Sequence, residues 1–322
     1  MIWLTWRQQR FEAALSVLAV CGAAVILAIT GTQLLGSFNA AGIPDCLRGI
    51  GDGTACSHAI SDFTSQVSAD QSIISWVAYL PMLLGALLAA PLVLEIEEGS
   101  YRLAWTQSVT RLRWTLLRVG LPIVAGVALT AVIAALGSWW LQPSDRVSSP
   151  LRPGSFDMQG VLPIAYMLLA LSITVCSGVV LRRGIAALAL GVATTVGFHF
   201  ALQTWLRPHF LPPITKVWVT GSAPFTARDW VIQGGPSQNY LYVDTAGNRF
   251  SLDQVNAMCG EPTAATKEVW ATCLQSRGLG EVIQFQPADR FWAFQGIEVA
   301  ILIGISVVLL AVATYWLLKR TA

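Results

Sequence analysis

Long apolar runs are the feature of this sequence that most constrains its fold. Polar segments separate six such runs, at residues 11–35, 73–94, 119–140, 161–181, 184–206 and 294–318. Each run has about 20 residues or more, which lets a helix cross the hydrocarbon core of a bilayer. Charged residues make up only 12% of the chain, against about 25% in soluble domains. The sequence therefore predicts an all-α polytopic membrane protein with six transmembrane helices.

The positive charges predict how the chain is oriented. Ten of the 20 Lys and Arg residues fall in four short segments on one side of the membrane: 1–10, 95–118, 182–183 and 319–322. Such residues are enriched in short cytoplasmic loops, so we expect both termini in the cytoplasm. The composition is rich in Ala, Gly, Trp and Arg, which indicates a bacterial plasma membrane protein. The net charge of +2 does not favour a nucleic-acid partner.

The chain divides into three parts by its pattern of apolar runs. Residues 1–206 would hold an amphipathic interfacial helix at 1–10 and five spans, with a polar loop at 36–72. Residues 207–290 would form a small α+β extracellular subdomain between helices five and six. It contains strand patterns at 216–219 and 281–285, a hairpin pattern at 240–252 and a helix pattern at 266–276. Residues 291–322 would hold the sixth span and a cytosolic tail.

Six cysteines fall into two classes. Cys21 and Cys176 lie inside apolar runs, where a cysteine usually serves packing. The other four form two close pairs in polar segments, Cys46 with Cys56 and Cys259 with Cys273. Paired cysteines of this kind favour disulfides on an oxidising, extracytoplasmic side. Metal binding is the alternative, although neither pair has CxxC spacing or neighbouring histidines.

One strongly charged stretch, residues 95–118, lies between the second and third apolar runs. Gly99 and Ser100 are expected to end one helix and begin another. Arginines and aromatic residues then alternate, as suits a short amphipathic helix at a cytoplasmic membrane surface. The residues alone leave two interpretations open: a solvated surface loop, or a docking surface for a cytosolic partner.

This stretch resembles the coupling segment of ABC exporter permeases, the six-span group that includes type-2 bacterial exporters and the sterol and drug half-transporters. The resemblance rests on an acidic pair, a glycine, a small hydroxyl residue and a Tyr-Arg-Leu run directly after the second span. The matching residues are Glu97, Glu98, Gly99, Ser100, Tyr101, Arg102 and Leu103, followed by Thr110 and Arg111, with Trp105 in the same segment.

The resemblance implies a non-catalytic permease that works as a dimer of two like copies. Two separate ATPase subunits would hold the ATP and Mg, and they would contact segment 95–118 and the N-terminal helix. Within the permease, Glu97 and Glu98 would pair with Arg7 or Arg10 of the N-terminal helix. The substrate would pass between the two copies, lined mainly by spans two and five. The apolar span interior suits a drug, peptide or lipid.

The partners implied by the resemblance are therefore two ABC ATPase subunits, a second copy of the permease as a homodimer, and membrane lipid. No cofactor is expected on this chain itself. The sequence has no GxxxxGK[ST] phosphate loop, HExxH motif or GxSxG motif, which agrees with a subunit that leaves ATP hydrolysis to another chain.

Two ionisable residues inside the apolar runs are candidates for the translocation pathway. Glu298 lies near the outer end of the sixth run, on the order of 6–9 Å below the external edge at 1.5 Å per residue. A carboxylate at that depth must face water or protein, and it is a functional candidate by default. The alternative is a snorkelling or helix-breaking acid at a re-entrant turn. His199 in the fifth run is either a packing residue or part of the pathway.

Two other function classes fit a six-span chain. A membrane-anchored ligand-binding sensor or receptor would use the outer subdomain, but the sequence shows no cytosolic effector domain. An ion-coupled secondary carrier would normally bury more ionisable residues at mid-membrane than the single Glu298. The sequence therefore favours the permease of an ABC exporter over both alternatives.

Overall fold

The computed structural model describes residues 2–50, 53–99, 110–218, 226–232, 242–261, 263 and 266–319. The chain is mostly helical and forms two compact units. The first, here called the membrane unit, comprises residues 1–144, 153–207 and 293–322. The second, here called the sheet unit, comprises residues 145–152 and 208–292.

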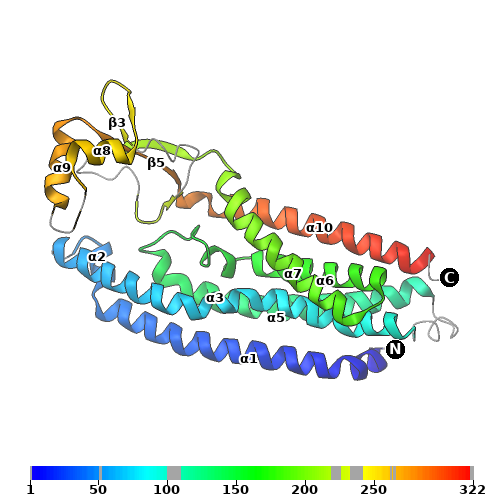
Figure 1. Cartoon of the computed structure of the whole chain (residues 1–322). Coiled ribbons are helices and arrows are strands. Elements are labelled where there is room, and N and C mark those ends of the chain that lie inside the picture. The colour runs from blue at the N-terminus through cyan, green and yellow to red at the C-terminus, as the bar shows by residue number, and fades with distance from the viewer. Residues whose placement is uncertain are drawn as a thin grey trace. The chain divides into compact units, whose positions relative to one another are not determined.

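Six helices in the described part of the chain are long and apolar enough to cross a membrane, as the sequence predicts. They belong to α1 (Ile2–Ala40), α3 (Gly53–Glu98), α5 (Arg111–Asp145), α6 (Leu162–Leu181), α7 (Gly184–Ala201) and α10 (Phe291–Lys319). They run alongside one another, and the described ends of α1 and α10 lie at the same end of the bundle (Figure 1). This arrangement is the one that an even number of spans requires.

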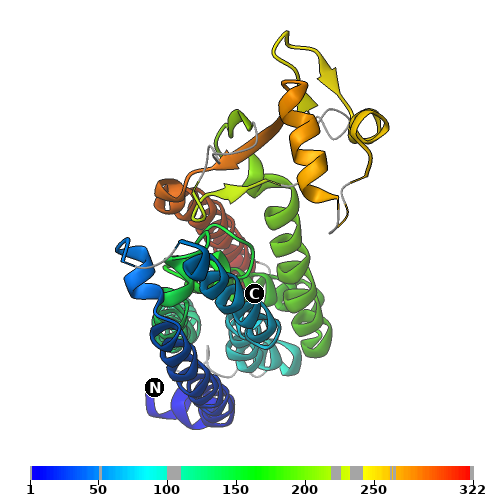
Figure 2. The same ribbon diagram turned by 90° about the vertical axis from the view of Figure 1, so that its left-hand side faces the viewer.

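Helices α3 and α6 form the centre of the membrane unit, and glycines bring them close together. A Cβ atom on Gly85 of α3 would lie 2.2 Å from the carbonyl oxygen of Met167 in α6. Two turns further along α6, a Cβ atom on Gly191 of α7 would lie 1.9 Å from Oγ1 of Thr174. Figure 2 shows the bundle nearly end-on. Because a side chain larger than hydrogen cannot fit at these contacts, the three helices pack as a tight group.

The prediction of a polar loop at residues 36–72 is wrong, because most of this segment is helical. Helix α1 continues to Ala40, the short helix α2 spans Ile43–Leu47, and α3 begins at Gly53, about 33 Å before the apolar part of α3 at 1.5 Å per residue. No glycine or proline interrupts the chain between Gly53 and Pro81. Phe63 and Val67 are buried on one face of this extension, and Phe63 contacts Phe38 of α1 with ring centroids 5.3 Å apart.

Two predicted boundaries also differ. The interfacial helix at 1–10 is not a separate element, because α1 is continuous from Ile2. Residues 111–118 belong to α5, which includes the third span, although the sequence assigned them to a surface helix. Helix α3 ends at Glu98, and Gly99 adopts a φ of +72°, a conformation that favours glycine. The predicted helix break at Gly99 is therefore confirmed.

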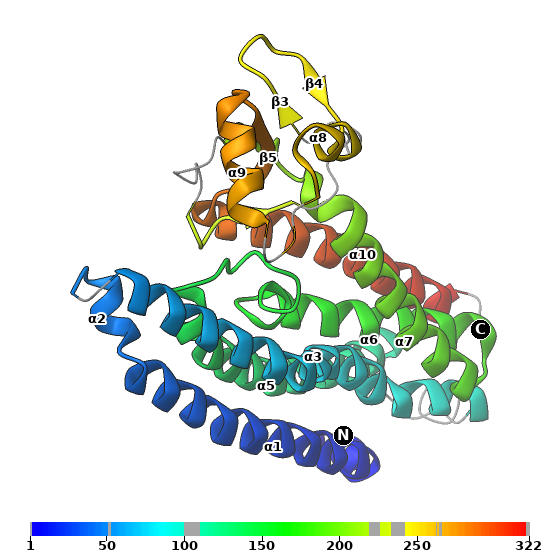
Figure 3. The same cartoon turned by 60° about the vertical axis from the view of Figure 1, so that its left-hand side comes forward.

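The sheet unit holds a small antiparallel sheet and two helices. Strand β5 (Gly280–Gln286) pairs with β1 (Ile214–Trp218), β2 (Trp230–Val231) and β3 (Tyr242–Val243), and β3 pairs with β4 (Arg249–Phe250). Helices α8 (Leu252–Cys259) and α9 (Lys267–Ser276) complete the unit, and Figure 3 shows α9 beside β5. A core of four buried residues holds strands and helices together: Tyr242, Val255, Leu274 and Leu279.

The strand patterns, the hairpin and the helix at 266–276 are confirmed, but α8 was not predicted. The sequence assigned residues 249–252 to a strand, whereas the strand ends at Phe250. Ser251 then caps α8: its side chain accepts a hydrogen bond from the N–H of Gln254, whose side chain accepts one from the N–H of Ser251. This Ser-x-x-Gln capping box is a recognisable signal in the sequence.

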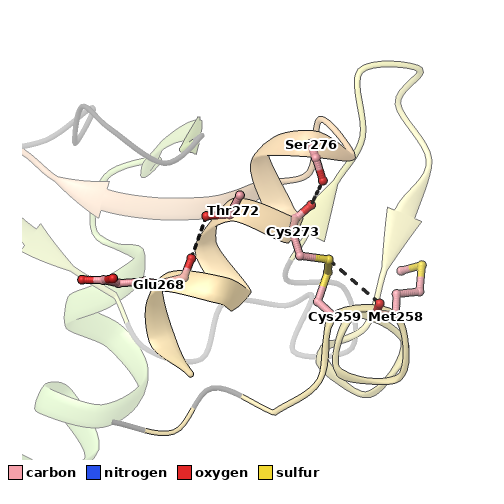
Figure 4. Close-up of a disulfide and its surroundings, with 6 residues drawn as sticks. All are labelled: Met258, Cys259, Glu268, Thr272, Cys273 and Ser276. Atoms are coloured by element: carbon pink, nitrogen blue, oxygen red, sulfur yellow. Dashed lines mark hydrogen bonds between the residues drawn. A yellow bond between two sulfur atoms is a disulfide. The ribbon is translucent and has the colours of Figure 1, made fainter. Parts of the chain in front are cut away.

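Both predicted disulfides are present. Cys46 pairs with Cys56, which links α2 to the start of α3. Cys259 pairs with Cys273, which links the end of α8 to α9 (Figure 4). The two Cα–Cα distances are 5.6 Å and 5.7 Å, within the range that a disulfide allows. Cys21 and Cys176 are free.

We expect the double variant Cys259→Ser/Cys273→Ser to lose about 3 kcal/mol of local stability, because the bridge closes a short loop of the unfolded chain. Hydrogen exchange of the amides in α8 and α9 measures this loss. Cys21→Ser/Cys176→Ser is the control and should leave exchange in these helices unchanged. Alkylation of Cys259 and Cys273 in the non-reduced protein would contradict the assignment.

Candidate functional site

Five polar side chains meet in the interior of the membrane unit, and we call them the buried ion cluster. They come from five separate elements: the 3₁₀ turn η1 (Phe156–Met158), α6, α7, the turn η3 (Arg207–His209) and α10. Both Arg207 and Glu298 have no exposed surface. The members of the cluster are Asp157, Tyr166, His199, Arg207 and Glu298.

Arg207 is the centre of the cluster. Its Nε donates to Oε2 of Glu298 at 2.9 Å, and its Nη2 donates to Oε1 of Glu298 at 2.8 Å. The same Nη2 donates to Oδ1 of Asp157 at 2.6 Å. The guanidinium carbon also lies 4.5 Å from the ring centroid of Phe156. One cation thus joins the loop before α6 to α10, in the two-pronged geometry that arginine forms with carboxylates.

A widened helical turn places Arg207 in this position. After α7 ends at Ala201, residues Leu202–Leu206 form a π-helical turn, η2. A π-helical turn takes up one residue more than an α-helical turn. Arg207 is the eighth residue after His199, but the extra residue places it where the seventh residue would lie in a regular α-helix. Residues seven apart share one face of an α-helix, so the side chains of Arg207 and His199 lie on the same face. Turns of this kind are frequent at functional sites.

Glu298 is held entirely by protein groups. Besides its two bonds to Arg207, it accepts a hydrogen bond from the hydroxyl of Tyr166 at 2.6 Å. The prediction that Glu298 faces protein rather than lipid is confirmed. The alternative of a snorkelling or helix-breaking acid is wrong, because Glu298 is fully buried and lies inside the continuous helix α10.

His199 is buried between aromatic rings and the cluster. Its ring centroid lies 5.1 Å from that of Tyr166 and 5.6 Å from that of Tyr79 in α3. Its Nε2 lies 3.8 Å from Oδ2 of Asp157. The sequence selected both His199 and Glu298 as candidates, and the structure places them in one cluster. Whether they line a translocation pathway stays a prediction.

Asp157 lies outside the six spans, in the segment between α5 and α6. Burial by itself raises the pKa of Asp157, but Arg207, His199 and the N–H of Gly154 together bring this pKa below its ordinary value. Gln295 of α10 fastens the same segment, because its Nε2 donates to the carbonyl oxygens of Phe156 and Gln159. Asp157 is therefore held as a charged carboxylate.

Sequence reasoning missed Arg207 and Asp157. It placed Arg207 at the start of the outer subdomain and did not single out Asp157, whereas both lie in the membrane unit. A signal was present: Asp157, Arg207 and Glu298 all lie near span ends on the same predicted side of the membrane. Opposite charges at one end of a helical bundle are expected to pair.

A second polar site lies where α3 meets α5 and α7. Glu95 near the end of α3 forms an ion pair with Arg118 of α5, and Arg118 is 6% exposed. Glu97 accepts a hydrogen bond at Oε2 from the N–H of Gly184, the first residue of α7, at 2.7 Å. These contacts join the two ends of segment 95–118 and fasten one end to α7.

The structure tests the predicted coupling residues only in part. Glu97 has Gly184 as its partner rather than Arg10, and the side chain of Arg7 lies outside the described residues. Glu98 is exposed. Five predicted coupling residues also lie outside the described residues: Ser100, Tyr101, Arg102, Leu103 and Trp105.

We expect Glu97→Ala to lower stability by about 1 kcal/mol, since it removes a hydrogen bond and a negative charge from the start of α7. Thermal unfolding measures the loss, and hydrogen exchange should speed up in the first turn of α7. Glu98→Ala is the matched control and should change neither. Equal effects of the two substitutions would show that the contact with Gly184 contributes nothing.

Comparison with known proteins identifies the family. The model of a family described as "ABC-2 membrane transporter related" matches residues 16–207, which is more than half of the chain. This chain belongs to that family. The match begins in α1 and ends at Arg207, so it includes the segment between α3 and α5. The resemblance to ABC permeases seen in the sequence is thereby confirmed.

Membership of the ABC-2 membrane transporter related family makes the chain a membrane transport component with six candidate spans. Proteins of this family are generally not catalytic themselves and normally pair with an ATPase subunit. Comparisons with curated proteins and with solved structures give no match. Among the described residues, no group of three or more His, Cys, Asp and Glu side chains could hold a metal ion.

Proposed function

We propose that this chain is the permease of an ABC exporter, in which two copies form the substrate pathway and two ATPase subunits drive it. The family match across residues 16–207 is the observation that carries the proposal. The six spans and the charged segment 95–118 between α3 and α5 support it. The chain itself has no phosphate-binding loop, so the ATP and Mg would be bound by the partner.

Energy would enter the permease through segment 95–118. The ion pair between Glu95 and Arg118 holds the two ends of this segment together, so a force on the segment would reach α3 and α5 at once. The bond from Gly184 to Glu97 would pass the same movement to α7. Helices α3 and α7 are the second and fifth spans, which line the pathway in the related exporters.

Aromatic side chains on α3 and α7 support a hydrophobic substrate. Trp76 is 77% exposed and Phe200 is 51% exposed, and Tyr79 lies between them, with ring centroids 6.3 Å from Trp76 and 6.5 Å from Phe200. Rings of this kind offer large apolar contacts to a drug, peptide or lipid. We infer that this aromatic face lines the space between the two copies.

The disulfides support an orientation with the sheet unit outside the cell. Both disulfides belong to segments that the charge distribution assigns to the external side, and disulfides persist in oxidising compartments. The positively charged segments, including 95–118, would then face the cytoplasm together with both termini. Labelling of single cysteines introduced at residues 98 and 253 tests this orientation, with residue 253 expected to react from outside.

The decisive experiment is purification of the tagged permease from cells that also express a candidate ABC ATPase from the same organism. We expect the two proteins to copurify, and ATP to drive uptake of a fluorescent hydrophobic substrate into inside-out vesicles. The matched control is an ATPase with its catalytic glutamate replaced. Transport that continues without ATP hydrolysis would reject the proposal.

The buried ion cluster favours a second candidate, an ion-coupled secondary carrier. The sequence argued against a carrier because Glu298 was the only acid seen within a span, but the structure adds Asp157, Arg207 and His199 around it. The same vesicles separate the two functions. A carrier would transport with an imposed proton gradient and no ATP, whereas the exporter would not.

A further inference from the structure

The charges of the buried ion cluster do not balance. Asp157 and Glu298 supply two negative charges, and Arg207 supplies one positive charge. Tyr166 is neutral, and its hydroxyl keeps its proton while it donates a hydrogen bond to Glu298. One negative charge therefore stays uncompensated, among side chains that are almost fully buried. A net charge in such surroundings is costly, and proteins usually remove it by binding a proton or a counter-ion.

His199 is the group in the cluster that can supply the missing positive charge. The groups facing it come from every element around it: Tyr79 of α3, Asp157 of η1, Tyr166 of α6, Arg207 of η3 and Glu298 of α10. Two of these are carboxylates and one is a guanidinium. The two carboxylates favour an imidazolium over a neutral imidazole, whereas burial and the guanidinium of Arg207 oppose it.

The geometry shows which nitrogen would take up the proton. Nε2 of His199 faces the carboxylate of Asp157 at 3.8 Å, so the neutral ring is best oriented with its hydrogen on Nε2. Nδ1 then carries a free lone pair, and it has no hydrogen-bond partner among the described residues. Binding of a proton there forms a new N–H bond and gives the ring its positive charge.

We propose that the buried ion cluster is a proton-binding site, in which His199 takes up one proton opposite Asp157. The bound proton neutralises the cluster and strengthens the link between Asp157 and α7. Its loss leaves one excess negative charge among the residues that join the loop before α6 to α7 and α10. The net charge of the cluster then depends on pH, at the end of the spans where Arg207 links the loop before α6 to α10. This inference goes beyond transport and holds for either candidate function.

Nitrogen NMR of ¹⁵N-histidine-labelled protein in nanodiscs tests the proposal directly. The chain has three histidines, and the background variant His58→Gln/His209→Gln leaves His199 as the one reporter. We expect its signals to change from the imidazolium to the neutral pattern as the pH rises from about 5 to about 8. Asp157→Asn should lower the midpoint by about one pH unit or more, since it removes an opposing charge.

The control for this shift is Asp62→Asn, which replaces an exposed carboxylate on α3 and should leave the midpoint unchanged. Glu298→Gln is the second cluster variant and should also lower it, which keeps the test valid if Asp157→Asn does not fold. A His199 signal that stays neutral throughout would overturn the proposal. A midpoint that neither cluster variant moves would overturn it equally. Because no outcome depends on transport, these results are separate from the test of the exporter function.

Discussion

Replacing Arg207 with Met is expected to be among the most destabilising single changes in the membrane unit, at about 3–5 kcal/mol. The substitution removes the only cation that contacts both Asp157 and Glu298 in the described structure. Two buried carboxylates are then left close together without a compensating cation. Their repulsion and lost solvation lower the free energy of unfolding by more than the loss of the hydrogen bonds alone. Thermal unfolding in detergent or nanodiscs measures the loss, and transport should fall with it.

Arg48→Met is the matched control, because Arg48 forms an ion pair with Asp45 at an exposed position. Exposed pairs contribute at most about 1 kcal/mol, so this variant should unfold close to the wild-type temperature. Adding Asp157→Asn and Glu298→Gln to Arg207→Met should restore part of the lost stability, since both stranded charges are then removed. If Arg207→Met and Arg48→Met had equal effects, the cluster would have no structural importance.

The double variant Tyr101→Ala/Arg102→Ala is expected to weaken ATPase binding at least about tenfold, and to abolish ATP-driven transport. Tyrosine and arginine are the side chains whose truncation most often costs an interface a large part of its binding energy. Copurification and vesicle transport measure the two effects. Expression and membrane insertion should persist, because the sequence places these residues in the charged segment between two apolar runs.

Arg290→Ala is the control for this pair, since Arg290 belongs to the sheet unit and bonds to Pro212 and Gln286 there. Arg207, which the sequence would place beside it on the outer face, is unsuitable because it is buried in the membrane unit. We expect Arg290→Ala to leave ATPase binding unchanged. Normal binding and transport by the Tyr101→Ala/Arg102→Ala variant would show that segment 95–118 is a solvated loop.

The number and positions of the spans followed from the sequence. A run of about 20 apolar residues has few stable alternatives to a membrane-crossing helix, and all six predicted runs lie in such helices. Local signals also sufficed for the helix break at Gly99 and for both cysteine pairs. The sequence did not predict the extension of α3 before its apolar run, because apolar residues are too sparse there to indicate a helix. The contact between Phe63 and Phe38 of α1, which stabilises the extension, is visible only in the structure.

The buried ion cluster depended on the tertiary structure. The sequence identified Glu298 and His199 one at a time, but their partners are distant in the chain: Asp157 lies 50 residues before Arg207, which lies 91 residues before Glu298. Local pattern cannot pair charges over such separations. The π-helical turn after α7, which aims Arg207 inward, also has no signal in the local sequence. Apolar length alone determined that this chain enters a membrane, whereas helix packing decided which charges could be buried there, because an ion is stable in that interior only beside its partner.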